Sequence, residues 1–305
     1  MLEYDTRTSV VICIPTFRRP KMLKRLLAAI AALETSAQIC VLVADNDAVG
    51  RAGLTLCLSM EDYRWPLTAV IAPKRGIAQA RNVLLEYALM TGAQFIAMID
   101  DDEWPQKNWI EHFLKTAQET GADVLQGSIL FGKARSADGH GDVRRPSGAV
   151  AMLQGTGNLL IRRTVLEDMT APWFDPQFAL SGGEDQDFFI RLKHDGKRFA
   201  WCDEARVHSD IPDTRASLGW LLRRSYSVGN SDMRVLLKYR LTPLQFILEV
   251  LKILASLLLS PLAAVILAVS PNRRAIALQK LFRAAGKLSA MAGWRYNEYA
   301  VIHGE

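Results

Sequence analysis

The sequence lacks the short motifs that mark several large enzyme classes. No G-x-G-x-x-G opens a strand-helix unit and no G-x-x-x-x-G-K-[ST] occurs, so dinucleotide oxidoreduction and P-loop hydrolysis have no support. A G-x-S-x-G elbow is also missing. Basic residues lie beside aromatic ones near Arg223 and Arg295, but no RNA-binding pattern accompanies them, so we expect no nucleic-acid partner.

Cysteine pairs and targeting signals are also absent. The four cysteines, Cys13, Cys40, Cys57 and Cys202, show no C-x-x-C spacing, which predicts reduced thiols in a cytosolic compartment. The N-terminus has no basic start followed by an apolar core, so we expect no secretion signal and no export.

The composition is that of a folded protein with a basic surface. Half of the 305 residues are hydrophobic, which is enough for one large α/β domain and an appendage. With 37 Lys and Arg against 32 Asp and Glu, the net charge is +5, which favours an anionic partner. Without an RNA-binding pattern, membrane lipid and nucleotide phosphates are the partners to consider.

Apolar runs and helical patterns alternate over residues 1–212. Strands are expected at 10–14, 39–44, 95–99, 149–153, 159–161 and 199–201. Helices are expected at 21–33, 78–91, 107–120 and 185–193, and a mobile loop at 131–147. This alternation predicts an α/β domain with a mainly parallel sheet flanked by helices.

Residues 213–305 form a second, helical region with an apolar segment at about 241–272. Ile253 to Asn272 carries no charge and is long enough to span a membrane, although Pro261 allows it to split into a re-entrant hairpin. Residues 273–290 predict a basic amphipathic helix of the kind that lies on an anionic membrane surface.

Two acidic motifs carry the candidate chemistry. Asp100-Asp101-Asp102-Glu103 directly follows an apolar strand, and such carboxylates suit Mg²⁺ or Mn²⁺, although an acidic turn capping the next helix is the competing interpretation. Ser181 to Phe188 places two glycines before acids that open a helix, which suits either a general base or an ordinary helix cap. His208 is a further candidate metal ligand, but a lone histidine is more often structural.

The order of these motifs resembles family 2 glycosyltransferases of the GT-A fold, a Rossmann-like architecture. The resemblance covers residues 10–210 through VVICIPTFRRP, VADNDA, KRGIAQARN, IDDDE, GTGNLLIRR and GGEDQDFFIRL. The variant IDDDE followed by Trp104-Pro105 is similar to enzymes that build bacterial exopolysaccharide repeat units on lipid carriers.

The resemblance implies a role for each matching residue. Pro15, Thr16, Arg18, Asp45, Arg81, Asp100 and Asp101 are expected on the donor side, with Asp45 accepting from the uracil ring and Arg81 pairing with the diphosphate or forming a structural ion pair. Asp102 and His208 are expected to hold the metal. Asp185 is expected as the general base, with Glu184, Trp104 and Asn158 binding the acceptor.

The resemblance therefore implies an inverting hexosyltransferase on the cytoplasmic face of the inner membrane, peripheral or re-entrant. The expected partners are a UDP-sugar, Mn²⁺ or Mg²⁺, a lipid-linked saccharide acceptor and anionic lipid. Two alternatives remain: a sugar-phosphate nucleotidyltransferase, which usually has a Gly-rich basic loop in place of PTFRRP, and an inactive membrane-docked scaffold of the same fold.

Overall fold

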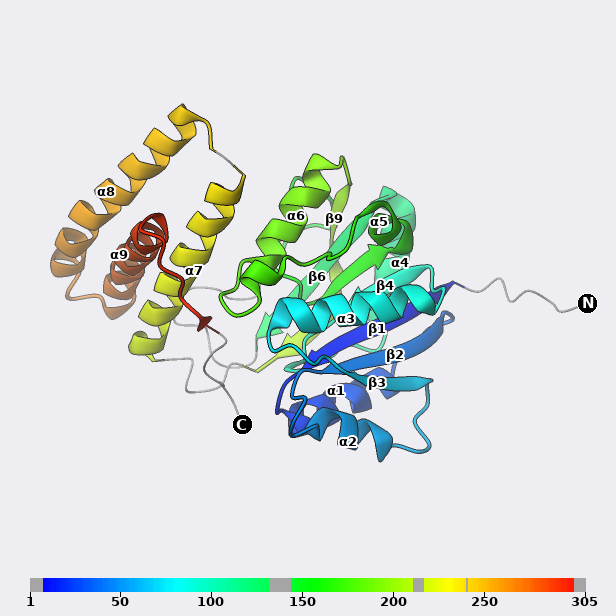
Figure 1. The fold of residues 1–305 in the computed structure, drawn as a ribbon. Helices are drawn as coiled ribbons and strands as arrows, with labels where there is room; N and C mark the ends of the chain where they lie inside the picture. The colour runs from blue at the N-terminus through cyan, green and yellow to red at the C-terminus, as the bar shows by residue number, and fades with distance from the viewer. Residues whose placement is uncertain (1–7, 132–143, 211–216, 240, 299–305) are drawn as a thin grey trace, which may run out of the picture.

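The computed structural model describes residues 8–131, 144–210, 217–239 and 241–298, and its centre is a nine-stranded sheet (Figure 1). The strand order is β3-β2-β1-β4-β8-β6-β9-β5, with β7 paired to β9. The strands are β1 (Ser9–Thr16), β2 (Gln38–Asp45), β3 (Leu67–Ile71), β4 (Phe95–Met98), β5 (Glu103–Pro105), β6 (Val124–Phe131), β7 (Gly148–Val150), β8 (Leu159–Arg162) and β9 (Phe199–Ser209).

Helices cover both faces of this sheet. They are α1 (Pro20–Ala31), α2 (Ala52–Leu58), α3 (Ile77–Met90), α4 (Trp109–Thr120), α5 (Arg163–Asp168) and α6 (Glu184–His194), with a short 3₁₀ helix at Pro176–Phe178. Residues of α1, α2 and α4 share one buried apolar cluster, and residues of α3, α5 and α6 share the other. Because both faces are covered, the central strands are apolar throughout, as in VVICI of β1.

The sheet is mixed, with a parallel half. β3, β2, β1 and β4 pair in parallel, as the alternation predicts. β8 is antiparallel to both β4 and β6, while β5 and β7 are antiparallel to β9. Most of the predicted 131–147 loop, residues 132–143, lies outside the described residues, as does the predicted domain boundary at 212.

The C-terminal helices α7 (Leu218–Lys238), α8 (Pro243–Ile266) and α9 (Pro271–Met291) form a separate group beside α6 (Figure 1). α9 packs against both α7 and α8. α8 continues through Pro261, so the apolar run does not split there. Among the described helices, α8 alone has the length and composition to cross a membrane, and most of it is exposed.

Polar contacts join α7 to the sheet domain. Arg234 donates to Ser181 and Gln177, and Lys238 pairs with Asp175 and Asp187. The helical group is therefore attached next to the GGEDQD motif rather than to a distant part of the sheet.

Candidate active site

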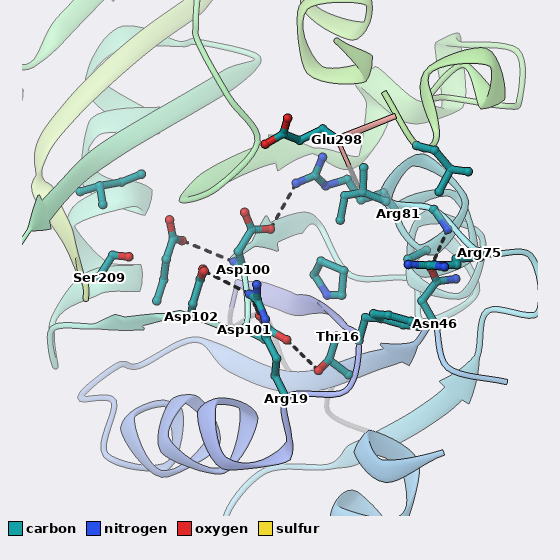
Figure 2. A pocket seen from close by; sticks show the side chains of 18 of the residues that line it. Thr16, Arg19, Asn46, Arg75, Arg81, Asp100, Asp101, Asp102, Ser209 and Glu298 are labelled. Carbon is teal, nitrogen blue, oxygen red and sulfur yellow. Dashed lines mark hydrogen bonds and ion pairs between the residues drawn. The ribbon is translucent and has the colours of Figure 1, made fainter. Parts of the chain in front are cut away.

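A cleft of about 370 Å³ opens at the carboxyl ends of β1 and β4, where open α/β sheets bind ligands. Among its lining residues are Pro15, Thr16, Arg19, Asn46, Arg75, Arg81, Asp100, Asp101, Asp102, Glu103, Trp220, Arg224 and Glu298. Five predicted donor-side residues (Pro15, Thr16, Arg81, Asp100 and Asp101) thus meet in one cavity, together with the predicted metal ligand Asp102 (Figure 2).

Arg19 stands between two of the acids. Its Nη1 lies 3.1 Å from Asp101 Oδ1 and 3.2 Å from Asp102 Oδ2, and Thr16 Oγ1 donates to Asp101 Oδ2 at 2.8 Å. Burial raises the pKa of Asp101 to about 7, against the opposing effect of Arg19. The guanidinium offsets part of the repulsion that the acidic run creates, a role that the sequence did not reveal.

Arg81 connects the two acidic motifs. It donates to Glu184 Oε1 at 2.7 Å and to Asp100 Oδ1 at 3.2 Å (Figure 2 shows the Asp100 contact). Glu184 is 3% exposed, and its Oε2 has no hydrogen-bond partner among the described residues. Burial and the neighbouring Asp185 raise the pKa of Glu184 to about 7. Glu184 therefore faces Arg81, and not an open acceptor surface.

Glu103 lines the cleft but is almost fully buried. It is 6% exposed, its Oε2 accepts the Asp100 N–H at 3.4 Å, and burial raises its pKa well above the usual value. A Cβ at Gly157 would come within 2.7 Å of Glu103 Oε1, so the G-T-G-N motif leaves room for this carboxyl group. Glu103 thus supports the acidic turn through its contact with the Asp100 N–H.

The acids suit a hard divalent cation, although His208 does not join them. The Asp100 and Asp102 side chains are 35% and 20% exposed and offer carboxylate oxygens to the cleft. His208 Nε2 instead lies 3.3 Å from Gln106 Nε2, and its ring stacks on Trp104. Among the described residues no three His, Cys, Asp or Glu side chains converge as ligands. Mg²⁺ is commonly held by one or two carboxylates plus substrate phosphates, which fits this set.

Two other predicted donor residues lie beside the cleft lining. The Asp45 carboxylate is fully buried and accepts the N–H groups of Gly53 and Leu54 at 2.8 and 3.0 Å, in the first turn of α2. Arg18 points to Asp47, with Nε and Oδ2 2.7 Å apart. The uracil contact of Asp45 stays a prediction.

Asn46, which had no assigned role, holds the base of the cleft. Its Nδ2 donates to the carbonyls of Ala72 and Lys74, and its Oδ1 accepts the Gly76 N–H at 2.7 Å. Gly76 has φ +131°, and a Cβ there would meet Ala179 at 2.6 Å. The amide therefore fixes the turn that starts α3 and brings Arg81 into the cleft.

Two predicted acceptor residues are occupied within the protein. Asn158 is fully buried, accepts from Trp109 Nε1 at 2.7 Å and donates to the carbonyls of Ser128 and Ala205. Its amide is thus hydrogen-bonded within the protein, and its acceptor contact stays a prediction. The Arg25 guanidinium lies over the Trp104 ring, with the Arg25 Cζ atom 3.3 Å from the ring centroid. The acceptor contact of Trp104 also stays a prediction.

Asp185 and Asp187 have different surroundings at the start of α6. Asp185 is partly exposed, accepts the Gln186 N–H at 2.7 Å and lies close to Gly155 of the G-T-G-N motif. Asp187 is fully buried and bound by Arg191, Lys238 and Tyr239. Of these two acids, Asp185 remains available to a ligand.

Comparison with known proteins now decides the family. Residues 11–166 match the model of glycosyl transferase family 2. The chain belongs to this family. It is 33% identical over 234 residues to the succinoglycan biosynthesis protein ExoM of Rhizobium meliloti (strain 1021), with 74% of each chain covered. The chain is therefore a glycosyltransferase related to exopolysaccharide biosynthesis, and the nucleotidyltransferase alternative falls away.

Solved structures confirm the GT-A fold of this family 2 member. The mannosyltransferase PcManGT from Pyrobaculum calidifontis, in complex with GDP-Man and Mn²⁺, has a TM-score of 0.57 at 16% identity and covers 97% of this chain and 78% of its own. S. aureus TarS with UDP-GlcNAc has a TM-score of 0.55 at 15% identity, covering 95% and 93%. The family match ends at residue 166, so the E-D-Q-D motif and α7 are assigned by geometry.

Proposed function

We propose that this glycosyltransferase moves a hexose with inversion from a UDP-sugar to a lipid-linked saccharide during synthesis of bacterial exopolysaccharide or another surface glycan. The observation that carries the proposal is the Arg81 bridge between Asp100 of the donor-side acids and Glu184 of the acceptor-side motif. One side chain thereby couples the two halves of a transfer site. PcManGT and TarS, both solved with nucleotide-sugars, support a nucleotide-sugar donor.

Asp100 and Asp102 are the proposed holders of Mn²⁺ or Mg²⁺, together with the donor phosphates. When bound, the cation neutralises charge on the departing diphosphate. Arg81 adds positive charge at the same edge of the cleft and keeps Asp100 in position. The PcManGT complex with Mn²⁺ supports this assignment.

Asp185 is the proposed general base. The acceptor hydroxyl oxygen forms a bond to the anomeric carbon, and the bond from that carbon to the diphosphate oxygen breaks with its electron pair. The hydroxyl proton passes to the Asp185 carboxylate. Glu184 acts in this proposal by positioning Arg81, because its carboxylate is buried against that guanidinium.

The helical group is the proposed membrane attachment on the cytoplasmic side. α8 exposes leucines along much of its length, including Leu251, Leu254, Leu258 and Leu262, while α9 exposes Arg273, Arg274, Lys280 and Arg283. An apolar helix next to a basic one suits the surface of an anionic leaflet, with the unbroken α8 in the interface plane.

A donor panel tests this function. UDP-, GDP- and TDP-sugars are supplied with Mn²⁺ or Mg²⁺ and a lipid-linked acceptor fraction, and transfer or slow donor hydrolysis is scored. Turnover with a UDP-sugar that EDTA abolishes and added Mn²⁺ restores is the expected result. Turnover with a GDP-sugar only would show that the proposed UDP-sugar donor is wrong. Turnover unaffected by EDTA would show that the reaction needs no divalent cation.

A further inference from the structure

Three cleft residues come from the C-terminal helical group and have no role so far. Trp220 and Arg224 of α7 and Glu298 beyond α9 line the same cavity as Arg81 and Asp100. In the view of Figure 2, Glu298 lies on the same side of the acidic cluster as Arg81. The Glu298 side chain is 10% exposed, and its Oε1 lies 3.6 Å from Arg224 Nη1. A carboxylate thus enters a cleft whose expected ligands are anions.

A close crossing of α7 and α9 fixes the position of Glu298. A Cβ at Gly286 would lie 2.0 Å from the Tyr226 carbonyl oxygen, and one at Gly229 would lie 2.0 Å from that of Arg283. Only glycine allows the two backbones to come this close. α9 is therefore held at one register along α7.

Beyond α9, a C-terminal strap, residues 292–298, follows α7 toward the cleft. The buried Asn230 donates to Ser289 Oγ and to the Trp294 carbonyl at 2.9 Å each, and its Oδ1 accepts the Tyr296 N–H at 3.2 Å. The Tyr296 ring then packs edge-on against Tyr226, with centroids 5.5 Å apart. The residues of the strap thus lie progressively closer to the N-terminal end of α7, where Arg224 pairs with Glu298.

We propose that Arg224 binds a pyrophosphate group in the cleft and that Glu298 is an internal anion that this group displaces. A guanidinium is suited to two phosphate oxygens because its N–H groups form a planar fork. Trp220, one turn along α7, gives the site an apolar wall. The inference rests on the proposed function, which supplies two pyrophosphate sources: the nucleotide-sugar and the lipid-linked acceptor.

The first experiment measures the affinity for inorganic pyrophosphate by calorimetry in EDTA, using the full chain. Arg224→Gln is expected to weaken binding about tenfold, the loss typical of a charged hydrogen-bonded pair. Glu298→Gln is expected to strengthen binding about two- to fivefold, because the competing ion pair is partly exposed. Arg223→Gln, which changes an exposed neighbour on α7, is the matched control and is expected to bind like the wild type.

Two further ligands identify the source of the pyrophosphate. If Arg224→Gln weakens the binding of UDP as much as that of inorganic pyrophosphate, the site serves the donor. If it weakens the binding of geranyl pyrophosphate but not of UDP, the site serves the acceptor. Unchanged affinity of a folded Arg224→Gln variant, or a loss confined to inorganic pyrophosphate, would overturn the proposal.

A folding defect is separable from this result. Arg224→Lys keeps the charge but loses the planar fork, so its affinity is expected between those of the wild type and Arg224→Gln, with an unchanged unfolding temperature. These measurements need no turnover. If no donor supported sugar transfer, the proposed function would be wrong, but the pyrophosphate-binding result would still stand.

Discussion

Arg81 donates a 2.7 Å hydrogen bond to Glu184, and the exposed fractions of these two side chains are only 5% and 4%. The contact joins residues 103 positions apart, one on α3 and one at the start of α6. Since Arg81 also reaches Asp100, a change at Glu184 is transmitted directly to the donor-side acids. A buried pair of this kind is costly to break on one side only.

Glu184→Gln is predicted to change how stability depends on pH. The pKa of Glu184 is raised from its usual 4.5 to about 7, so the folded protein binds an extra proton between these values. Wild-type stability therefore falls, by a few kcal/mol, as pH rises from 4.5 through 7, and the variant lacks this contribution. In thermal unfolding at pH 5 and pH 8, the unfolding temperature of the variant relative to that of the wild type should be higher at pH 8 than at pH 5.

Two comparisons isolate this effect. Asp101, whose pKa burial also raises to about 7, contributes the same slope to both proteins and cancels. Glu86→Gln, on an exposed part of α3, should follow the wild type at both pH values. An identical slope for Glu184→Gln and the wild type would show that Glu184 remains ionised when buried.

Asp185→Asn is predicted to reduce transfer by about 10² to 10⁴-fold with little change in donor affinity. The variant keeps the shape of the side chain but removes the proton acceptor. Turnover with the best donor of the panel and calorimetric donor binding are measured together. Near-normal transfer by this variant, alongside an inactive but folded Glu184→Gln, would move the base to Glu184.

Asp187→Asn is predicted to act on stability instead of catalysis. Its buried carboxylate is bound by Tyr239 and by two partly exposed cations, Arg191 and Lys238, so the change weakens all three contacts. A loss of about 2 kcal/mol is expected from denaturant unfolding, with turnover per folded molecule retained. A stable but inactive Asp187→Asn protein would contradict this division of roles.

Asp102→Asn and Arg19→Gln are predicted to shift Mn²⁺ affinity in opposite directions. The first removes a ligand and should weaken both Mn²⁺ and UDP-sugar binding. The second removes the guanidinium that lies between Asp101 and Asp102, so the empty protein should bind Mn²⁺ more tightly and unfold at a lower temperature without metal. Electron paramagnetic resonance of free Mn²⁺ measures the affinity, with Asp62→Asn, on an exposed loop, as the control. If neither EDTA nor Asp102→Asn changed the donor affinity, the assignment of a metal to this site would be wrong.

The sequence predicted those parts of the molecule that depend on local pattern. The apolar strand before Asp100 and the helix that follows Gly183 both leave a periodic signal, so the acidic motifs were found on the right elements. The parallel half of the sheet followed from the same alternation. Short elements such as β5 and α5 were missed because three to six residues give no clear period.

The site partners could not be predicted because they depend on long-range packing. Nothing local tells that Arg19 meets Asp101, or that Asn158 is enclosed by Trp109, Ser128 and Ala205. Glu298 is the extreme case. Its place in the cleft requires the glycine crossing of α7 and α9 and the Asn230 contacts, none of which has a sequence signature.

The last prediction concerns the helical group: α8 is expected to lie in the interface without carrying α9 across. α9 is tied to α7 by backbone contact at Gly286, and α7 is tied to the sheet domain through Arg234 and Lys238. α9 folds back along α8, where Glu249 of α8 pairs with Lys287 of α9. A single span would break these contacts and move the basic residues after Asn272 outside, against the rule that positive segments stay cytosolic.

Asn272→Cys, in the exposed first turn of α9, reports the topology. An impermeant maleimide added to intact spheroplasts should leave it unlabelled, while inverted vesicles should label it strongly. Lys107→Cys, on the exposed surface of the sheet domain, is the matched cytosolic control. The native Cys13, Cys57 and Cys202 are buried, and the partly exposed Cys40 is replaced by serine in both variants. Labelling of Asn272→Cys in intact spheroplasts, with Lys107→Cys still protected, would mean that α8 spans the membrane and that α9 separates from α7, because the two positions would then lie on opposite sides of the bilayer.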